Sequence, residues 1–264
     1  MKKTDPIGIF DSGVGGTSIF AELHKLLPNE DTIYLADSKN APYGNKSKQE
    51  IIDLCFKNTD FLLQQNCKII VVACNTATTN AIKELRQRYK VPIIGIEPAI
   101  KPAALNSRKK VIGILATKGT LSSELFLETS DEFAKGIDVI EVIGTGLVEA
   151  IEKGEQNTAE TKKHLQSLLE PMLTKGIDYL VLGCSHYPYL IPQLKEILPE
   201  EVFIIDSGEA VARQTKTVLK SLNLLSEKAS KEPVFYTNTN INVLQMLLKT
   251  STKKRFNNIS YLDF

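Results

Sequence analysis

Two cysteines occupy matching places in this sequence, each at the end of an apolar run. Cys74 follows the run IIVVA and Cys184 follows the run YLVLG, and small polar residues come directly after both. A helix start and nearby hydrogen-bond donors lower the pKa of a thiol, so we expect both to form thiolates readily. Cys74 alone would be explained equally well as a core residue. Two matched thiols across a cleft instead indicate an acid and a base that move a proton.

Small polar residues also follow the other apolar runs. In doubly wound sheets, ligands bind outside the carboxyl ends of the strands, where these residues would gather. Backbone N–H groups at helix starts, with hydroxyl and amide side chains, hold carboxylates without a basic patch. The sequence therefore predicts a site for a small anion, and its candidate residues are Asp11, Ser12, Asn75, Thr76, Thr117, Thr120, Ser185 and His186.

Some of the cysteines and strand-end residues also allow a purely structural interpretation. Cys55 and Cys67 lie within helical or loop segments and are interpreted as small buried apolar residues. His186 could be a core histidine, but its place two residues after Cys184 favours control of protonation there. Asp11 could cap a helix, but we favour a role in the site. The glycine-rich stretch 11–16 lacks both the GxGxxG pattern and the lysine of a phosphate-binding loop, so a nucleotide site is not expected.

Apolar runs that alternate with amphipathic stretches predict an α/β fold, and the pattern occurs twice. Gly8 corresponds to Gly113, Cys74 to Cys184 and Ile94 to Ile204, at nearly constant offsets of 105, 110 and 110 residues by subtraction. We interpret this as an internal duplication of a βαβαβ unit. Each half should form a mostly parallel sheet with helices on both faces. The strands are expected at 7–10, 32–36, 68–73, 92–96, 110–116, 138–143, 178–183 and 201–206.

Length and composition agree with two domains. The chain has 264 residues and 42% hydrophobic residues, and its net charge is +1. We predict a first α/β domain from 1–97 plus 208–264 and a second from 98–207. The domains should be pseudo-symmetric and doubly wound, with the active site in the cleft between them. The less regular tail should complete one of the two sheets.

The charge balance and the apolar runs also bear on partners and location. A balanced charge gives no reason to expect a nucleic-acid partner. No run of about 18 apolar residues predicts a membrane span, and the start lacks a signal sequence, so we expect a cytoplasmic protein. With only three histidines and no CxxC pair, no metal site is expected.

At this point an ordered set of motifs resembles the cofactor-independent glutamate racemases of the aspartate/glutamate racemase family. The two cysteine motifs, at 73–78 and 182–188, are the most specific, and the similarity extends over nearly the whole chain. The other matching stretches are 10–16, 36–44, 95–103, 116–123, 147–154 and 205–212.

The resemblance implies racemisation of glutamate by two bases, without pyridoxal phosphate or another cofactor. One cysteine, as thiolate, removes the Cα proton, and the other, as thiol, protonates the opposite face. By similarity, Cys74 acts on D-glutamate and Cys184 on L-glutamate. Asp11 assists near Cys74, and His186 near Cys184, with Glu152 in support. The D-glutamate would supply peptidoglycan synthesis, and the resemblance suggests a homodimer.

The resemblance also assigns the substrate-binding residues. They are Asp11, Ser12, Tyr43, Gly44, Asn75, Thr76, Thr117, Thr120, Ser185 and His186. The sequence departs from the family at Ser185, usually threonine, at Asn40, often arginine, and at Phe126, usually tyrosine. None of these changes removes a group that the mechanism needs. The chain also lacks the N-terminal extension of members that a cell-wall precursor activates, so that regulation is not expected.

Three other functions remain open from the sequence. An aspartate or hydantoin racemase would keep both cysteines in a different pocket. A binding or regulatory protein on the same scaffold would tend to lose one thiol. A redox role for Cys74 and Cys184 predicts a reversible disulfide. A second role, such as the restraint of DNA gyrase seen in some members, also stays open.

Overall fold

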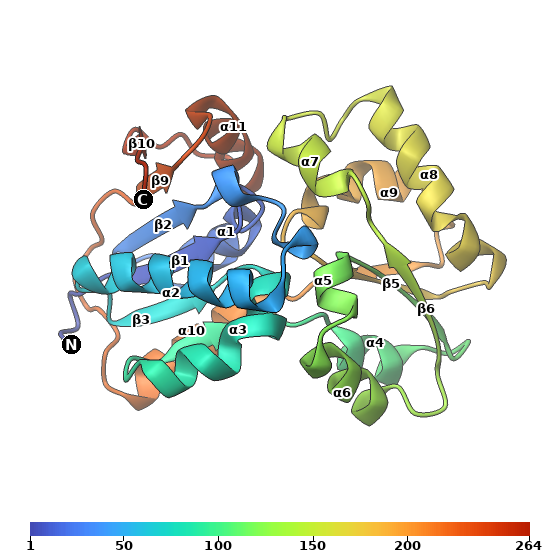
Figure 1. The fold of residues 1–264 in the computed structure, drawn as a ribbon, viewed down its shortest axis with the longest axis horizontal. Coiled ribbons are helices and arrows are strands. Elements are labelled where there is room, and N and C mark those ends of the chain that lie inside the picture. The colour runs from blue at the N-terminus through green and yellow to red at the C-terminus, as the bar shows by residue number, and fades with distance from the viewer.

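Two parallel β-sheets lie side by side in the computed structural model, which describes residues 1–264 (Figure 1). The first sheet has six strands in the order β10-β9-β2-β1-β3-β4, and the second has four in the order β6-β5-β7-β8. The first sheet comprises β1 (Ile7–Asp11), β2 (Thr32–Ala36), β3 (Ile69–Val72), β4 (Ile93–Gly95), β9 (Val234–Thr237) and β10 (Ile259–Tyr261). The second comprises β5 (Val111–Ala116), β6 (Asp138–Ile143), β7 (Tyr179–Gly183) and β8 (Phe203–Ile205). The α/β fold with parallel sheets is confirmed.

The two sheets share one strand order, β2-β1-β3-β4 in the first and β6-β5-β7-β8 in the second. Their registers also correspond, because Gly8 pairs with Ile70 and Gly113 pairs with Leu180. These pairs differ by 105 and 110 residues (113 − 8 and 180 − 70), the offsets seen in the sequence. This agreement supports the predicted duplication.

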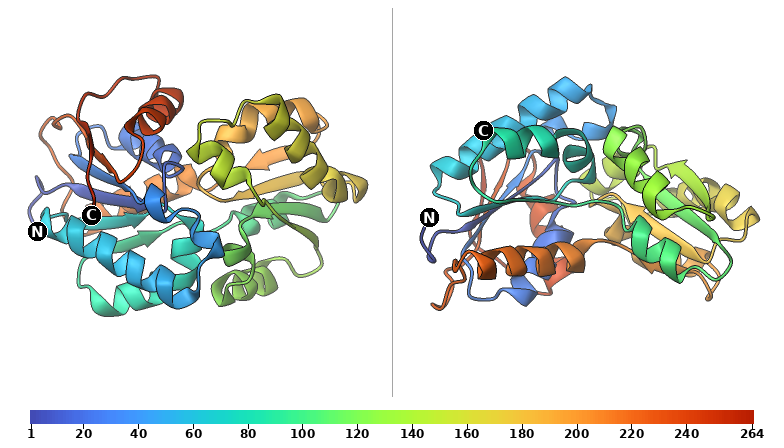
Figure 2. Two further views of the ribbon diagram at one scale, coloured as in Figure 1. Left: turned by 45° about the horizontal axis from the view of Figure 1, so that its top comes forward. Right: turned by 90° about the horizontal axis from the view of Figure 1, so that it is seen from below.

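Helices cover both faces of each sheet, and the right-hand view of Figure 2 shows these layers edge-on. Strand residues alternate between the faces, so one face of both sheets shares a continuous core and the opposite faces have separate ones. The shared core contains residues of α1 (Thr17–Leu26), α7 (Leu147–Glu152), α8 (Ala159–Thr174), α9 (Ile191–Ile197), α10 (Gly208–Ser221) and α11 (Ile241–Thr252). The opposite faces pack on α2 (Lys48–Gln64) and α3 (Asn75–Arg88) in the first sheet, and on α4 (Ile100–Asn106), α5 (Lys118–Leu121) and α6 (Glu124–Phe133) in the second. None of these helices has both the length and the apolar character needed to cross a membrane.

The chain passes between the sheets twice, after β4 and after β8. The Ser207 hydroxyl donates to the Glu97 carbonyl at 2.5 Å and joins the two crossings. Both crossings coincide with the predicted domain limits of 97/98 and 207/208, which remain a proposal.

Local signals located most elements, with two differences. Ser47 and Glu50 form the predicted capping box at the start of α2. The helix expected only in the later part of 76–90 begins at Asn75, with Cys74 as its N-cap. The loop expected at 38–47 contains two short 3₁₀ helices, η1 (Ser38–Asn40) and η2 (Tyr43–Asn45). The tail completes the first sheet with β9 and β10, as predicted.

A buried aspartate fastens the start of β7 and allows a pH-dependent prediction. Asp178 accepts hydrogen bonds from the Ser107 hydroxyl at 2.7 Å, the Arg108 N–H at 2.7 Å and the Lys109 N–H at 2.9 Å. Burial by itself raises the pKa of this carboxyl, but the hydrogen bonds outweigh burial and hold the pKa below its usual value. The stabilisation is therefore present above the unfolded pKa of about 3.9 and is lost as the pH falls through the lower folded pKa.

We expect Asp178→Asn to lower the free energy of unfolding at pH 7 by about 1–3 kcal/mol, because charged acceptors make the stronger hydrogen bonds. Urea unfolding at pH 7 and again near pH 3 measures this difference, which should narrow at the acidic pH. Asp138→Asn, at an exposed position, is the matched control. An equal effect of Asp178→Asn at both pH values would contradict the prediction.

Candidate active site

Cys74 and Cys184 lie at equivalent ends of equivalent strands. Cys74 follows β3 and caps α3, where its Sγ accepts a hydrogen bond from the Ala77 N–H at 3.4 Å. Cys184 follows β7, the counterpart of β3 in the second sheet. Both side chains are buried, and a series of contacts connects them: the Cys74 thiol donates to Ser12, whose neighbour Asp11 accepts from Ser185, next to Cys184. The structure thus brings the two predicted thiols into one site.

The expected low pKa of Cys74 is not observed. Burial raises the pKa of this thiol well above its usual value, and the nearby carboxylate of Asp11 raises it further. The thiol donates to the Ser12 hydroxyl at 3.5 Å, and the contacts with Ser12 and Ala77 lower the pKa only in part. The prediction was wrong because it counted the helix start and left out the cost of burying a charge. Burial and the charge of Asp11 therefore favour the protonated thiol at Cys74.

Asp11 connects the two halves of the site. Its Oδ2 accepts hydrogen bonds from the N–H groups of Gly13 at 3.2 Å and Gly16 at 3.0 Å, and its Oδ1 accepts from the Ser185 hydroxyl at 3.0 Å. Burial raises the pKa of Asp11, although His186 and the donors oppose this effect. A carboxyl with a raised pKa can share a proton with its neighbours more easily than an ordinary aspartate.

His186 lies between Cys184 and Glu152. Its Nδ1 is 3.8 Å from the Cys184 Sγ, and its Nε2 is 2.6 Å from the Glu152 Oε1. Burial by itself lowers the pKa of His186, but the hydrogen bonds with Cys184 and Glu152 and the charges of Cys184 and Asp11 raise it well above its usual value. A protonated imidazole at this position stabilises negative charge on the Cys184 sulfur.

Two glycines let the loop after β1 pass close to this group. A Cβ added at Gly13 would overlap the carboxylate of Glu152, and one added at Gly15 would overlap the imidazole of His186. The Val14 N–H between them donates to the Glu152 Oε1 at 2.7 Å. The glycines therefore bring backbone N–H groups of the first sheet's loop against side chains from the second.

We expect Gly15→Ala to lower kcat/KM for racemisation by about 100-fold, because it would displace His186, a predicted catalytic group, and a displacement of about 1 Å has effects of this size. Initial rates across the pH range test this, and the pH profile should shift because His186 is displaced. Urea unfolding of the same variant separates this effect from a loss of folded protein. A rate within twofold of the wild type would contradict the role given to this contact.

Asn75 is the most informative of the predicted substrate-binding residues. It is the first residue of α3 and is 2% exposed, yet neither its Oδ1 nor its Nδ2 has a hydrogen-bond partner. Leaving a buried amide unpaired costs free energy, so such groups are rare without a reason. This amide can both donate to a ligand carboxylate and accept from a ligand ammonium group.

Three threonine hydroxyls meet where the two sheets face each other. Thr76 of the first half lies 2.8 Å from Thr117 and 3.2 Å from Thr120 of the second, measured between Oγ1 atoms. Thr117 and Thr120 are 3.1 Å apart. Hydroxyls both donate and accept, so this group can exchange its mutual hydrogen bonds for those of a ligand.

Tyr43 and Gly44 lie on η2, next to this hydroxyl group. A Cβ added at Gly44 would lie 2.8 Å from the Thr117 Cβ. The Tyr43 hydroxyl donates to Asp37 at 2.6 Å and accepts from the Asn58 amide at 3.1 Å, both within the first half. Asp37 and Asn58 therefore hold the loop in place. The sequence gives no signal for Asn58, which looks like any polar residue within a helix, whereas Asp37 stands at the end of an apolar run, as the predicted site residues do.

Comparison with known proteins gives consistent results. Residues 7–215 match the model of the Asp/Glu/hydantoin racemase family. A glutamate racemase of Ectopseudomonas mendocina is 46% identical over 244 residues, 92% of this chain and 93% of that protein. Among solved structures, glutamate racemase RacE1 of Bacillus anthracis has a TM-score of 0.88 and 30% identity, covering 99% of this chain and 98% of its own.

A second solved structure includes a ligand. Glutamate racemase of Escherichia coli, in complex with L-glutamate and the activator UDP-MurNAc-Ala, has a TM-score of 0.86 and 31% identity. The similarity covers 97% of this chain and 98% of that one.

Proposed function

Because this chain belongs to the Asp/Glu/hydantoin racemase family, we propose that it interconverts L-glutamate and D-glutamate, with Cys74 and Cys184 as the two acid–base groups and no added cofactor. The substrate is supported by the glutamate racemases that the chain resembles over most of its length. The two-base mechanism is supported by the position of the thiols in this structure.

The observation that carries the proposal is the symmetry of the two cysteines. A racemase needs a proton acceptor on one face of a carbon and a proton donor on the other. Equivalent strands of two sheets with the same order present one thiol each to a shared site. Asn75, next to Cys74 at the start of α3, has free hydrogen-bonding groups for the substrate.

The arrangement of these groups suits a reaction that begins from L-glutamate. A Cys184 thiolate, stabilised by protonated His186, removes the Cα proton and becomes a thiol. The Cys74 thiol, kept protonated by burial and by Asp11, gives its proton to the other face and becomes a thiolate. When D-glutamate leaves, Cys184 is the thiol and Cys74 is the thiolate. The reverse reaction begins from that form.

The remaining residues position these groups and the substrate. Asp11 accepts a hydrogen bond from Ser185, and Glu152 contacts the imidazole of His186, so the two carboxylates orient the residues that surround the thiols. We assign the two carboxylates and the ammonium group of glutamate to polar side chains and backbone N–H groups around them. These groups belong to Ser12, Tyr43, Gly44, Asn75, Thr76, Thr117, Thr120, Ser185 and His186.

The test is circular dichroism of pure L-glutamate with protein that has been treated with EDTA and freed of pyridoxal phosphate. We expect the optical signal to decay to zero, and in deuterated water the product should carry deuterium at Cα. An unchanged signal would refute the racemase assignment, whereas activity on aspartate alone would reassign the substrate.

The resemblance also supports a cellular role. We propose that D-glutamate made by this chain in the cytoplasm supplies peptidoglycan synthesis, and that the chain acts as a homodimer. Sedimentation equilibrium of the purified protein measures the oligomeric state, and a monomer at micromolar concentration would contradict the second proposal.

A further inference from the structure

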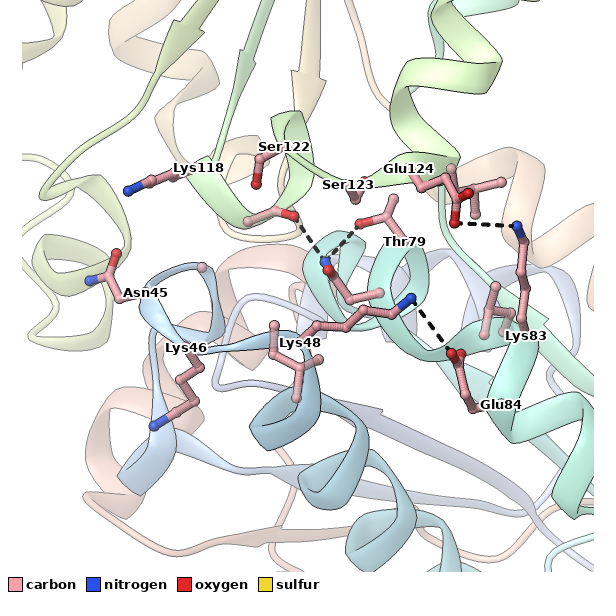
Figure 3. Close-up of a pocket in the computed structure, with 16 residues that line it drawn as sticks. Asn45, Lys46, Lys48, Thr79, Lys83, Glu84, Lys118, Ser122, Ser123 and Glu124 are labelled. Carbon is pink, nitrogen blue, oxygen red and sulfur yellow. Dashed lines mark hydrogen bonds and ion pairs between the residues drawn. The ribbon is translucent and has the colours of Figure 1, made fainter.

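A cavity of about 420 Å³ lies next to the threonine hydroxyl group of the proposed active site, and Figure 3 shows the residues that line it. Its lining comes from η2 and the start of α2, from α3, and from α5 and the start of α6. It therefore lies between the two halves of the chain, on the same side as the Tyr43 loop. The two cysteines do not line it.

The cavity is positively charged, whereas the chain as a whole is nearly neutral. Four lysines and two glutamates line it, which gives +2 by subtraction (4 − 2). Two of the lysines are paired, because Lys48 lies 3.7 Å from Glu84 and Lys83 lies 3.9 Å from Glu124.

Lys46 and Lys118 form no ion pair, and in Figure 3 both extend away from these glutamates. Their ammonium groups are therefore available to a mobile anion.

The wall between the cavity and the active site is thin. Gly44 and Gly119 line the cavity, and they also contact the threonine hydroxyl group. A Cβ added at Gly119 would lie 2.9 Å from the Thr76 Cγ2 and 3.0 Å from the Gly44 Cα. Gly44 and Gly119 therefore lie between the cavity and the group to which we assign substrate binding, and the Asn80 amide, which also lines the cavity, donates to the carbonyls of Thr76 and Gly119 at 2.9 Å.

The proposed active site is closed in this structure. Cys74, Asn75 and His186 are 4%, 2% and 1% exposed, so glutamate can reach them only if a wall moves. Separation of Gly44 from Gly119 would open the site directly into the cavity. Loops that cover active sites move in this way in many enzymes.

We propose that this cavity is an entry site, in which the incoming substrate binds before the wall of Gly44 and Gly119 opens. The ligand class is an amino dicarboxylate. Its carboxylates match the free ammonium groups of Lys46 and Lys118. Its ammonium group would compete with Lys48 and Lys83 for Glu84 and Glu124. The proposal rests on the proposed function, because it takes glutamate as the substrate.

Kinetics in both directions test the role of the lysines. With Lys46→Gln/Lys118→Gln, we expect kcat/KM at low ionic strength to fall by about tenfold, within the range known for electrostatic steering, and kcat to stay within twofold. The difference should shrink at about 0.3 M salt because mobile ions screen exposed charges. Lys46→Arg/Lys118→Arg should restore the wild-type values.

The matched control is Lys216→Gln/Lys220→Gln, which removes the same charge from α10, on the opposite face of the first sheet. An unchanged kcat/KM in Lys46→Gln/Lys118→Gln, or an equal fall in the control, would overturn the proposal. A wild type that does not racemise glutamate would instead refute the proposed function.

A second measurement distinguishes binding of glutamate in the cavity from long-range attraction of glutamate by the two lysines. Asn75→Asp places a carboxylate in the inner site and should prevent glutamate from binding there. In this variant, L-glutamate should still slow the reductive methylation of Lys46 and Lys118, measured by mass spectrometry, but not that of Lys216 and Lys220. Loss of this protection would show that glutamate does not bind in the cavity.

Discussion

Cys74→Ala and Cys184→Ala should each lower the rate of racemisation in both directions by about 10³-fold or more. Acid–base groups contribute about 10²- to 10⁴-fold each, and racemisation needs both faces of the carbon. Neither thiol can replace the other, because each is attached to its own sheet. Racemisation is measured by circular dichroism, and solvent exchange at Cα by mass spectrometry in deuterated water.

The matched control is Cys67→Ala. Cys67 is also a buried cysteine, but it lies before β3, where its sulfur packs beside Gly8, away from the site. This variant should keep its activity within a few-fold. Near wild-type racemisation by either Cys74→Ala or Cys184→Ala would refute the two-base assignment. A reversible disulfide between Cys74 and Cys184 that controls activity would favour the redox interpretation instead.

Lys68→Met should lower the free energy of unfolding by about 3–5 kcal/mol, the range for breaking a buried ion pair. Lys68 is fully buried, and its Nζ lies 2.5 Å from the Glu30 Oε2. The ammonium group also donates to the carbonyls of Lys3 at 2.5 Å and Leu224 at 2.9 Å. The substitution leaves Glu30 buried without its counter-ion and removes the hydrogen bonds that hold the carbonyls of Lys3 and Leu224.

Urea unfolding measures this effect, and the chain offers a matched control. Lys3 pairs with Glu227 at 2.6 Å, but these side chains are 40% and 80% exposed. Lys3→Met should therefore change the free energy of unfolding by less than about 1 kcal/mol. Lys68 lies at the opposite end of β3 from Cys74, so folded Lys68→Met protein should racemise normally. A loss of less than 1 kcal/mol in Lys68→Met would contradict the prediction.

Much of the fold could be predicted because its signals are local. Runs such as IIVV are apolar on both faces, which is typical of a central parallel strand, and β3 is fully buried. The spacing that relates Cys74 to Cys184 recurs in the register of β1 with β3 and of β5 with β7. A duplicated strand order therefore placed both cysteines at the same end of their sheets.

The contacts within the site could not be predicted in the same way. Ser185 and Asp11 are 174 residues apart, and His186 and Gly15 are 171 apart, so no sequence period relates them. These contacts depend on how the two sheets face each other. The same reason explains Asn58 and Lys68, whose partners come from other elements.

The sequence by itself determined which thiols and polar groups lie at the strand ends, because residue type and strand pattern are local properties. Only the tertiary structure decided their protonation. The helix start at Cys74 favours a thiolate, but burial and the charge of Asp11 oppose it more strongly. Conversely, the contacts with Cys184 and Glu152 raise the pKa of His186 despite its burial, which favours the protonated imidazole. Desolvation and through-space charge depend on what surrounds a group in three dimensions, and the chain fixes those surroundings only when both halves have folded together.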